Sequence, residues 1–350
     1  MAHRVSRREF VDRAGRVALA TPFLSLWGCG QDRAGELVSL AGNTMGTTYS
    51  VKLVGLPADF DVQSLAQEVD GVLETIDQRM STYRADSELS RFNAAPAGEW
   101  MPISADTRHV IAEAVTVSEM TGGAFDPSVG PIVDLWGFGP QERRQQPPNE
   151  DAIAALRSRV GMDKLMVRSN PSAVSKQSDG LRLDLSGIAK GFGVDQVAML
   201  LEARGLSNYL VEVGGELRSS GRGPEQRPWR IGIEKPLAGS GDLQQIVELG
   251  RAALATSGNY RLYFDYDGQT YCHLIDPATG HPVTHDLASA TVVAATTAEA
   301  DAFSTALLVL GPEAGSTFAA EHDIAALFII ASGGSFRAEP SPAYERRFLA

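Results

Sequence analysis

The sequence predicts an α+β fold: one domain with a mixed, mainly antiparallel sheet and packed helices. Segments of helical and strand periodicity are interspersed without the strict strand–helix alternation of a doubly wound sheet. The chain has 350 residues, 43% of them hydrophobic, which is enough for one large core. The sequence shows no internal repeat and no long linker. We therefore expect a single domain over residues 38–340, followed by a C-terminal tail at 341–350.

The first 37 residues are predicted to be an export signal and a tether. Residues 6–11, SRREFV, form a twin-arginine pattern, and a moderately apolar run follows up to Trp27. Twin-arginine signals are bacterial export addresses. The stretch that ends at Cys29 resembles a lipobox, so Cys29 would be lipidated, with ordinary signal cleavage nearby as the alternative. We expect a signal at 1–28, a tether at 29–37, and a periplasmic location that is lipid-anchored to a membrane if Cys29 is acylated.

The N-terminal half of the domain is predicted to start with a strand over Thr47–Val54, which is rich in β-formers. Asp61–Met80 places apolar residues at helical spacing, and its first residue is a suitable N-cap. A second amphipathic helix is expected over Ala105–Met120. Loops are expected over Tyr83–Asn93 and over Gly122–Gly139, where glycine and proline are frequent.

The C-terminal half is predicted to be richer in strands. Helices are expected over Ala189–Ala203, Ala298–Leu310 and Glu313–Glu321. The expected strands are Lys164–Val167, Leu181–Leu185, Tyr209–Val213, Trp229–Glu234, Gln245–Leu249, Tyr260–Tyr266, Tyr271–Ile275, Thr291–Ala295 and Ala325–Ala331.

The charge balance limits the possible partners. The chain has 31 Lys plus Arg against 43 Asp plus Glu, which gives a net charge of −12. Such a surface repels phosphate backbones, so we expect no nucleic-acid partner. An anionic substrate would need a local metal ion or a lysine. The only two cysteines, Cys29 and Cys272, provide neither a disulfide framework nor a cysteine metal site.

Residues 183–191, LDLSGIAKG, form the most specific local motif. A strand is predicted to end at Asp184 and a helix to begin near Ile188. Backbone amides at a helix N-terminus favour anions, and Lys190 adds a positive charge. The spacing differs from that of a Walker A loop. The motif predicts either an anion-binding turn, or a simple turn with Asp184 as a cap and Lys190 in solvent.

A second motif combines a carboxylate and a hydroxyl. Asp301 and Thr305 are four residues apart on a predicted helix, so their side chains share one face. Carboxylate and hydroxyl oxygens suit a hard cation such as Mg²⁺. The alternative is that Asp301 only stabilises the first turn of the helix.

Two further stretches have side chains suited to binding or proton transfer. His273, which is predicted to lie inside a strand, precedes a turn in the segment HLIDPATG. Its titration range suits proton transfer, and a purely structural hydrogen bond is the alternative. In residues 123–130, GAFDPSVG, Phe125 could cover an aromatic ligand and Asp126 could bond to it.

In this order, the motifs resemble the ApbE family of FAD:protein FMN transferases. The matching stretches are Met45–Thr47, Ser81–Tyr83, Gly123–Pro127, Asp184–Gly191, Val213–Glu216, His273–Gly280 and Asp301–Thr305. The resemblance covers roughly residues 40–335. It implies an ApbE-like domain related to the T-fold.

The resemblance also implies roles for individual residues. Mg²⁺ would be held by the backbone carbonyl of Gly187 and by the side chains of Asp301 and Thr305. The proton of an attacking hydroxyl would be accepted by His273 or Asp301, the two expected catalytic residues. The residues expected to bind FAD are Met45, Tyr83, Ala124, Phe125, Asp126, Asp184, Lys190 and His273.

The implied activity is a Mg²⁺-dependent transfer of FMN. The enzyme would cleave the pyrophosphate of FAD, attach FMN through a phosphoester to a Thr or Ser of an acceptor protein, and release AMP. The implied acceptors are membrane proteins: subunits of the sodium-pumping NADH:quinone reductase, of the Rnf complex, or the regulator linked to nitrous oxide reduction. Two alternatives are a Mg²⁺-dependent FAD pyrophosphatase and a non-catalytic FAD-binding lipoprotein. A metal beside the pyrophosphate favours catalysis over storage.

Overall fold

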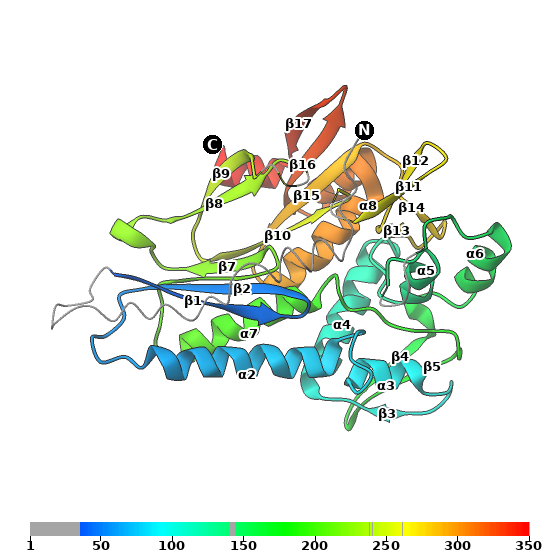
Figure 1. Cartoon of the computed structure of the whole chain (residues 1–350), viewed down its shortest axis with the longest axis horizontal. Helices are drawn as coiled ribbons and strands as arrows, with labels where there is room; N and C mark the ends of the chain where they lie inside the picture. Colours follow the sequence, from blue (N-terminus) through cyan, green and yellow to red (C-terminus); the bar gives the residue numbers. More distant parts are fainter. Residues whose placement is uncertain (1–35, 140–143, 238, 240, 261, 350) are drawn as a thin grey trace.

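The computed structural model describes residues 36–139, 144–237, 239, 241–260 and 262–349, so the predicted signal lies outside the described residues. An eight-stranded sheet forms the centre of the molecule, and every neighbouring pair in it is antiparallel (Figure 1). In spatial order its strands are β1 (Leu37–Thr44), β2 (Thr47–Val54), β6 (Tyr209–Val213), β7 (Glu216–Ser220), β10 (Ala252–Gly258), β15 (Leu287–Ala294), β16 (Ala325–Ser332) and β17 (Ser335–Pro340). The expected α+β class is confirmed.

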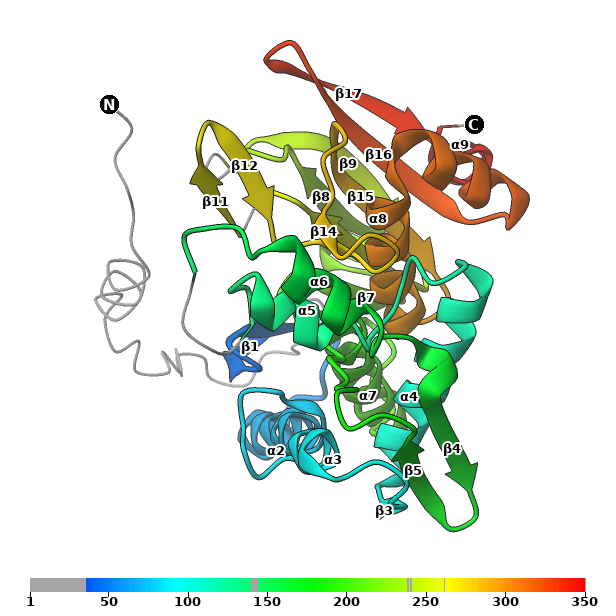
Figure 2. The ribbon, with the colours of Figure 1, turned by 90° about the vertical axis from the view of Figure 1, so that its right-hand side faces the viewer.

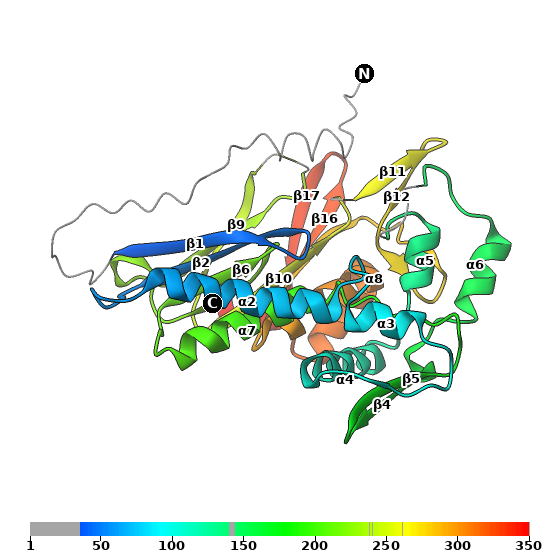
Figure 3. The same ribbon diagram turned by 60° about the horizontal axis from the view of Figure 1, so that its bottom comes forward.

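Both faces of this sheet are covered. The covering elements are α2 (Val62–Met80), α7 (Ala189–Ala203), α8 (Thr297–Glu321), the hairpin of β8 (Trp229–Glu234) and β9 (Leu243–Leu249), and α9 (Pro342–Phe348). Helices α2, α7 and α8 lie on one face, as Figure 3 shows. In β6, Val211 and Val213 pack toward α2 and α7, whereas Leu210 packs toward the β8–β9 hairpin on the other face. The two-residue period of the strands therefore separates two apolar layers.

The remaining elements gather at one end of the sheet (Figures 1 and 2). They are α3 (Glu88–Ala94), α4 (Ala105–Met120), α5 (Gly130–Leu135), α6 (Glu150–Arg157), the sheet of β3 (Met101–Pro102), β5 (Ser172–Lys176) and β4 (Leu165–Ser169), and the hairpins of β11 (Tyr263–Tyr266) with β12 (Gln269–Cys272) and of β13 (Ile275–Asp276) with β14 (His281–Pro282). Two short 3₁₀ turns also occur, at Met162–Lys164 and, between β7 and β8, at Pro224–Gln226. No helix in the described ranges is both long and apolar enough to cross a membrane.

The predicted helices are confirmed together with their boundaries. The Asp61 side chain caps α2 by accepting a hydrogen bond from the Ser64 amide at 2.9 Å. Two helices were expected between Ala298 and Glu321, and α8 does leave helical geometry between them. The backbone at Gly311 has φ 81°, immediately before Pro312. Glycine adopts this conformation without the steric cost that a side chain would add.

The strand predicted at Leu181–Leu185 is wrong. This segment forms only one isolated bridge, between Arg182 and Val129. Its backbone groups bond to a side chain instead, because the Asn93 amide accepts from the Leu183 N–H and donates to the Leu183 carbonyl, both at 2.8 Å. Asn93 thus occupies the place of a neighbouring strand.

Three other segments also differ from the prediction. The loop expected at Tyr83–Asn93 contains α3, which is capped by the Ser87 hydroxyl. The loop expected at Gly122–Gly139 contains α5. The segment expected as a C-terminal tail forms α9, in which Tyr344 is fully buried against the sheet.

Candidate active site

A cavity of about 660 Å³ lies where α7 and α8 begin, beside β7 and β10. Its volume falls within the usual range for small-molecule sites. All the side chains and backbone positions singled out from the sequence line it, namely Met45, Tyr83, Ala124, Phe125, Asp126, Asp184, Gly187, Lys190, His273, Asp301 and Thr305. The fold therefore brings together motifs that are separated by up to a few hundred residues.

Lys190 lies between two carboxylates. Its Nζ is 3.5 Å from Asp301 Oδ2 of α8 and 3.5 Å from Glu216 Oε1 of β7. It also donates a hydrogen bond to the Ser186 carbonyl at 2.7 Å. Burial alone lowers the pKa of Lys190, but Asp301 and Glu216 more than offset this and raise it. Lys190 is thus a fixed positive charge facing the cavity.

Asp301 is the most buried ionisable group of the site, with 2% of its surface exposed. The Gly191 amide donates a hydrogen bond to its Oδ2 at 3.2 Å. Burial raises the pKa of Asp301, and the opposing effects of Lys190 and the Gly191 amide are smaller. Burial thus disfavours the ionised form of Asp301, and a cation bound beside the carboxylate would stabilise that form.

A directed chain of hydroxyl groups orients Thr305. The Ser304 hydroxyl donates to the Asp301 carbonyl at 2.9 Å, so its oxygen must accept from Ser257, which is 2.8 Å away. Ser257 has then used its only hydrogen, and its oxygen must accept from Thr305 Oγ1 at 3.1 Å. The hydrogen of Thr305 therefore points toward Ser257, which leaves the lone pairs of Oγ1 to face other groups.

The expected metal ligands lie next to one another. A β-carbon built on Gly187 would be 3.3 Å from Thr305 Oγ1, so the backbone of Gly187 lies against this hydroxyl. Among the described residues, no group of three or more His, Cys, Asp and Glu side chains could hold a metal. The donor set is instead one carboxylate with neutral oxygens. This set fits Mg²⁺, which commonly binds proteins through one or two carboxylates and completes its shell with substrate phosphates and water.

The turn before α7 is tied to the Gly123–Pro127 loop. The Asp184 amide donates to the Pro127 carbonyl at 2.7 Å, and Asp184 Oδ1 accepts from the Ser186 amide at 2.9 Å. Asp126 Oδ1 accepts from both the amide and the hydroxyl of Ser128, at 2.8 and 2.6 Å. Burial raises the pKa of Asp126, although these two bonds oppose the shift. Both carboxylates therefore stabilise turns while they line the cavity.

Aromatic and apolar groups form the rest of the lining. Phe125 is buried, whereas Tyr83 has 65% of its surface exposed. Met45 lies in the β1–β2 turn with φ 45° and is followed by Gly46 with φ 72°. An aromatic ring at the exposed edge of the cavity is suited to cover a planar ligand.

His273 follows β12 directly, so it lies after the strand and not inside it as predicted. Its Nδ1 is 3.2 Å from the carbonyl oxygen of Leu262. Because a carbonyl only accepts, Nδ1 must carry the proton, and the lone pair is then on Nε2. The Phe138 ring packs against the imidazole in a T-shaped arrangement, with the ring centroids 6.4 Å apart. This tautomer can act as a base at Nε2.

The sequence motifs did not single out two residues of this site. Glu216 ends the Val213–Glu216 stretch, to which no side-chain role was assigned from the sequence, and its carboxylate pairs with Lys190. Ser257 has no motif at all, because its role depends on the approach of β10 to α8.

Comparisons with known proteins agree with this geometry. The family model described as the ApbE family matches residues 45–328. The FAD:protein FMN transferase of Vibrio cholerae serotype O1 is 43% identical over 94% of this chain and 97% of its own length, and that of Escherichia coli K12 is 37% identical over 94% and 96%. Among solved structures, the flavin transferase ApbE from Vibrio cholerae superposes with a TM-score of 0.83 at 41% identity, covering 89% of this chain and 99% of that one. The apo flavinyl transferase ApbE from Pseudomonas stutzeri gives a TM-score of 0.83 at 40% identity, covering 90% and 98%.

Proposed function

This chain belongs to the ApbE family and is an FAD:protein FMN transferase, and we propose that it breaks the pyrophosphate of FAD at a Mg²⁺ site between Gly187 and α8. The observation that carries the proposal is the contact of the Gly187 backbone with Thr305, one helical turn after the buried Asp301. The carbonyl of Gly187 and the side chains of Asp301 and Thr305 would hold the ion. When bound, Mg²⁺ supplies a Lewis acid that neutralises charge on the phosphate oxygens.

The side chains around this position would act on the phosphates and the leaving group. Lys190 is held as a cation beside Asp301, so it places a preorganised positive charge where negative charge develops. Met45, Tyr83, Ala124, Phe125 and Asp126, all lining the cavity, would contact the FAD.

The transfer step needs a group that accepts a proton. The hydroxyl oxygen of an acceptor Thr or Ser forms a bond to the phosphorus of the FMN half, and the bond from that phosphorus to the bridging oxygen breaks, so AMP leaves. We assign the hydroxyl proton to Nε2 of His273, because its Nδ1 proton is fixed on the Leu262 carbonyl. Asp301, the other candidate base, is committed to Lys190 and the Gly191 amide.

The location and the acceptor follow from the signal and the reaction. We propose export by the twin-arginine route to the periplasm, with a lipid anchor at Cys29, on the basis of residues 6–11 and the lipobox-like stretch. The acceptor would be a membrane protein with an accessible Thr or Ser, such as a subunit of the NADH:quinone reductase, of the Rnf complex, or the regulator linked to nitrous oxide reduction.

One incubation separates the possible reactions. The protein is mixed with FAD, Mg²⁺ and an acceptor, and the products are identified by mass spectrometry. Covalent FMN on the acceptor is expected, whereas free FMN with AMP would indicate a pyrophosphatase and unchanged FAD would indicate a binding protein.

A single substitution tests the metal assignment. Asp301→Ala should abolish turnover while FAD binding, measured by flavin fluorescence, weakens much less, because the carboxylate serves the ion more than the flavin. Glu299→Gln removes an acidic group from the same helix outside the cavity and should have normal activity. An Asp301→Ala protein that transfers FMN at the normal rate in Mg²⁺ would refute the assignment.

A further inference from the structure

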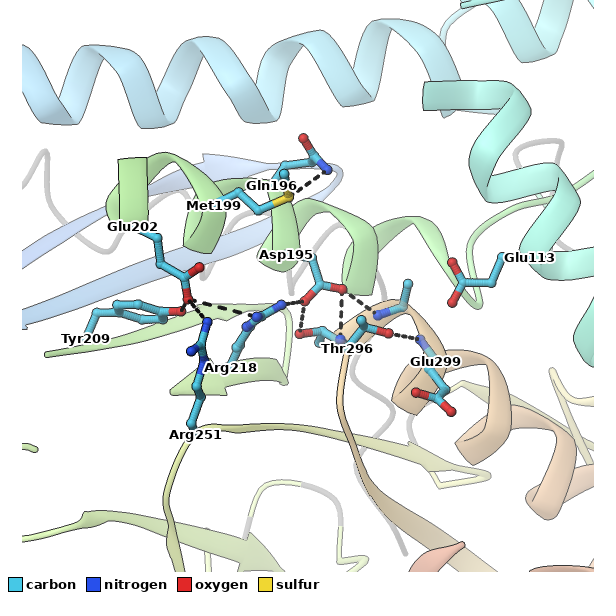
Figure 4. A network of polar contacts seen from close by, with 12 residues as sticks. Glu113, Asp195, Gln196, Met199, Glu202, Tyr209, Arg218, Arg251, Thr296 and Glu299 are labelled. Carbon is cyan, nitrogen blue, oxygen red and sulfur yellow. Dashed lines mark hydrogen bonds and ion pairs between the residues drawn. The ribbon is translucent and has the colours of Figure 1, made fainter. Parts of the chain in front are cut away.

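A buried carboxylate behind the site fastens α7 to the start of α8. Asp195, in α7, is 7% exposed and does not line the cavity. Its Oδ2 accepts from the amides of Thr297 and Ala298 at 2.8 and 3.0 Å, and its Oδ1 accepts from Thr297 Oγ1 at 3.0 Å (Figure 4). Arg218 Nη1 donates to the same Oδ1 at 2.8 Å. A side chain of another helix thus provides most of the N-terminal cap of α8.

The cap that Thr296, the residue before α8, provides is weaker than the cap from Asp195. The Thr296 hydroxyl accepts a hydrogen bond from the Glu299 amide at 3.3 Å, and this is the only first-turn amide that it takes. The start of α8 is therefore held by Asp195 more than by the preceding residues of its own segment.

The contacts of Asp195 join the same elements, α7, α8 and β7, as the contacts of Lys190 in the cavity. On β7, Glu216 and Arg218 are two residues apart and share one face of the strand, where they pair with Lys190 and Asp195 of α7. On α8, the partners are Asp301 for Lys190 and Thr297 for Asp195, four residues apart. The same three elements are therefore joined twice, once inside the cavity and once in the protein interior behind it.

The backbones between these two sets of contacts are very close. A β-carbon on Gly191 would lie 2.3 Å from the Thr297 carbonyl oxygen, so α7 and α8 touch at this point. Gly191 also donates its amide to Asp301. Any shift of the first turn of α8 would therefore move Asp301 relative to Lys190 and Gly187.

We propose that Asp195, with Arg218, is a positioning residue for the cation site: it fixes the first turn of α8 so that Asp301 and Thr305 meet the Gly187 carbonyl. The proposal rests on the Mg²⁺ site described above. Asp195 sets the affinity for the cation without touching the cation or FAD. Second-sphere groups of metal sites commonly change affinity by about 10- to 100-fold when they are replaced.

The test measures cation binding without turnover. Mn²⁺ is titrated into the protein with FAD and without an acceptor, and free Mn²⁺ is followed by electron paramagnetic resonance. In Asp195→Asn, the side-chain oxygen can still accept from the two α8 amides. The side-chain nitrogen then takes the place of Oδ1 and cannot accept the hydrogen bond from Arg218. We expect about 10-fold weaker Mn²⁺ binding, with FAD affinity in EDTA unchanged and kcat largely recovered at saturating cation.

Two further variants make the result decisive. Arg218→Met removes the other partner of the pair and should weaken Mn²⁺ binding in the same direction; it also gives the answer if Asp195→Asn fails to fold. Glu202→Gln is the control. Glu202 bonds to Tyr209 and Arg251 and lies 4.0 Å from Nη2 of Arg218, the nitrogen that does not bond to Asp195, and it has no hydrogen bond or ion pair to Asp195 or α8 (Figure 4). The melting temperature of this variant should fall while its Mn²⁺ affinity stays normal.

Two results would overturn the proposal: normal Mn²⁺ affinity in folded Asp195→Asn and Arg218→Met, or an equal loss in Glu202→Gln. Failure of the Mg²⁺ site itself would look different, since the wild-type protein would then bind no Mn²⁺ in the presence of FAD.

Discussion

Replacing Gly191 by alanine should separate α7 from α8 and disable the site. The new β-carbon would lie 2.3 Å from the Thr297 carbonyl oxygen and 2.8 Å from the Ala298 α-carbon. Both are backbone atoms, so no side-chain rotation relieves the overlap, and the helices must part by roughly 1 Å to reach ordinary contact. That shift would lengthen the 3.5 Å Lys190–Asp301 distance and the 3.2 Å bond from the Gly191 amide to Asp301 beyond useful range. Overpacking of this kind costs about 1–3 kcal/mol, and a misplacement of about 1 Å can lower a rate by about 100-fold.

Thermal melting and FMN transfer to an acceptor measure the two effects of Gly191→Ala separately. We expect a fall of several degrees in the melting temperature and a loss of transfer near 100-fold. Gly71→Ala is the matched control, because Gly71 lies within α2 and a β-carbon there would meet nothing within 4 Å. It should raise stability by about 0.5–1 kcal/mol through a better helix propensity and leave transfer unchanged. If Gly191→Ala melts and transfers FMN like the wild-type protein, the close approach of the two helices does not hold the site.

Three other predictions concern single side chains. Ser257→Ala removes the acceptor of the Thr305 hydrogen and should raise the half-saturating Mg²⁺ concentration about 10-fold. The control is Ser219→Ala, which removes a buried hydroxyl that bonds to the Gly250 carbonyl, and it should leave this concentration unchanged. Equal half-saturating concentrations in the two variants would contradict the role of Ser257 in orienting Thr305. His273→Gln should lower kcat about 100- to 10,000-fold with little change in the KM for FAD, and a normal kcat would exclude His273 as the base. Tyr344→Phe removes a buried hydroxyl that has no hydrogen-bond partner among the described residues, so stability should rise by about 1 kcal/mol. Burial raises the pKa of Tyr344 above its ordinary value of 10.0, so the wild-type protein should lose stability as the pH rises past that value. The melting temperature at alkaline pH should fall less in Tyr344→Phe than in the wild-type protein. An equal fall would show that ionisation of Tyr344 does not cause the loss.

Local patterns were enough for elements whose stability is local. The apolar spacing and the cap in Asp61–Met80 lie within one helix, and both are present in α2. The strand β10 was not predicted, because apart from Leu254 its sequence AALATSG consists of small residues and shows no alternation. Small side chains are needed there since α8 packs closely on it, which is a requirement set by a distant segment. Short helices such as α3 are below the length at which periodicity is visible.

The same distinction applies to the site. Asp184, Lys190 and Asp301 belong to motifs with local chemical meaning, and the cavity brings them together. The contacts that orient them are not local: Ser257 bonds to Thr305, 48 positions away, and Asp195 bonds to Thr297, 102 positions away. No spacing rule within one segment could have indicated these pairs. The error at Leu181–Leu185 has the same origin, because Asn93 comes from another part of the chain.

The position of Lys190 has a consequence for the order in which ligands arrive. Its charge is already matched by Asp301 and Glu216, so the empty pocket of this acidic protein offers little net attraction to a diphosphate. We expect FAD and the divalent cation to reinforce each other, each tightening the other by the same factor, as thermodynamic linkage requires. Below saturation, the rate of FMN transfer would then depend on the product of the FAD and Mg²⁺ concentrations. At a constant flavin supply, the free Mg²⁺ around it would then act as a second control on how quickly acceptor proteins receive their cofactor.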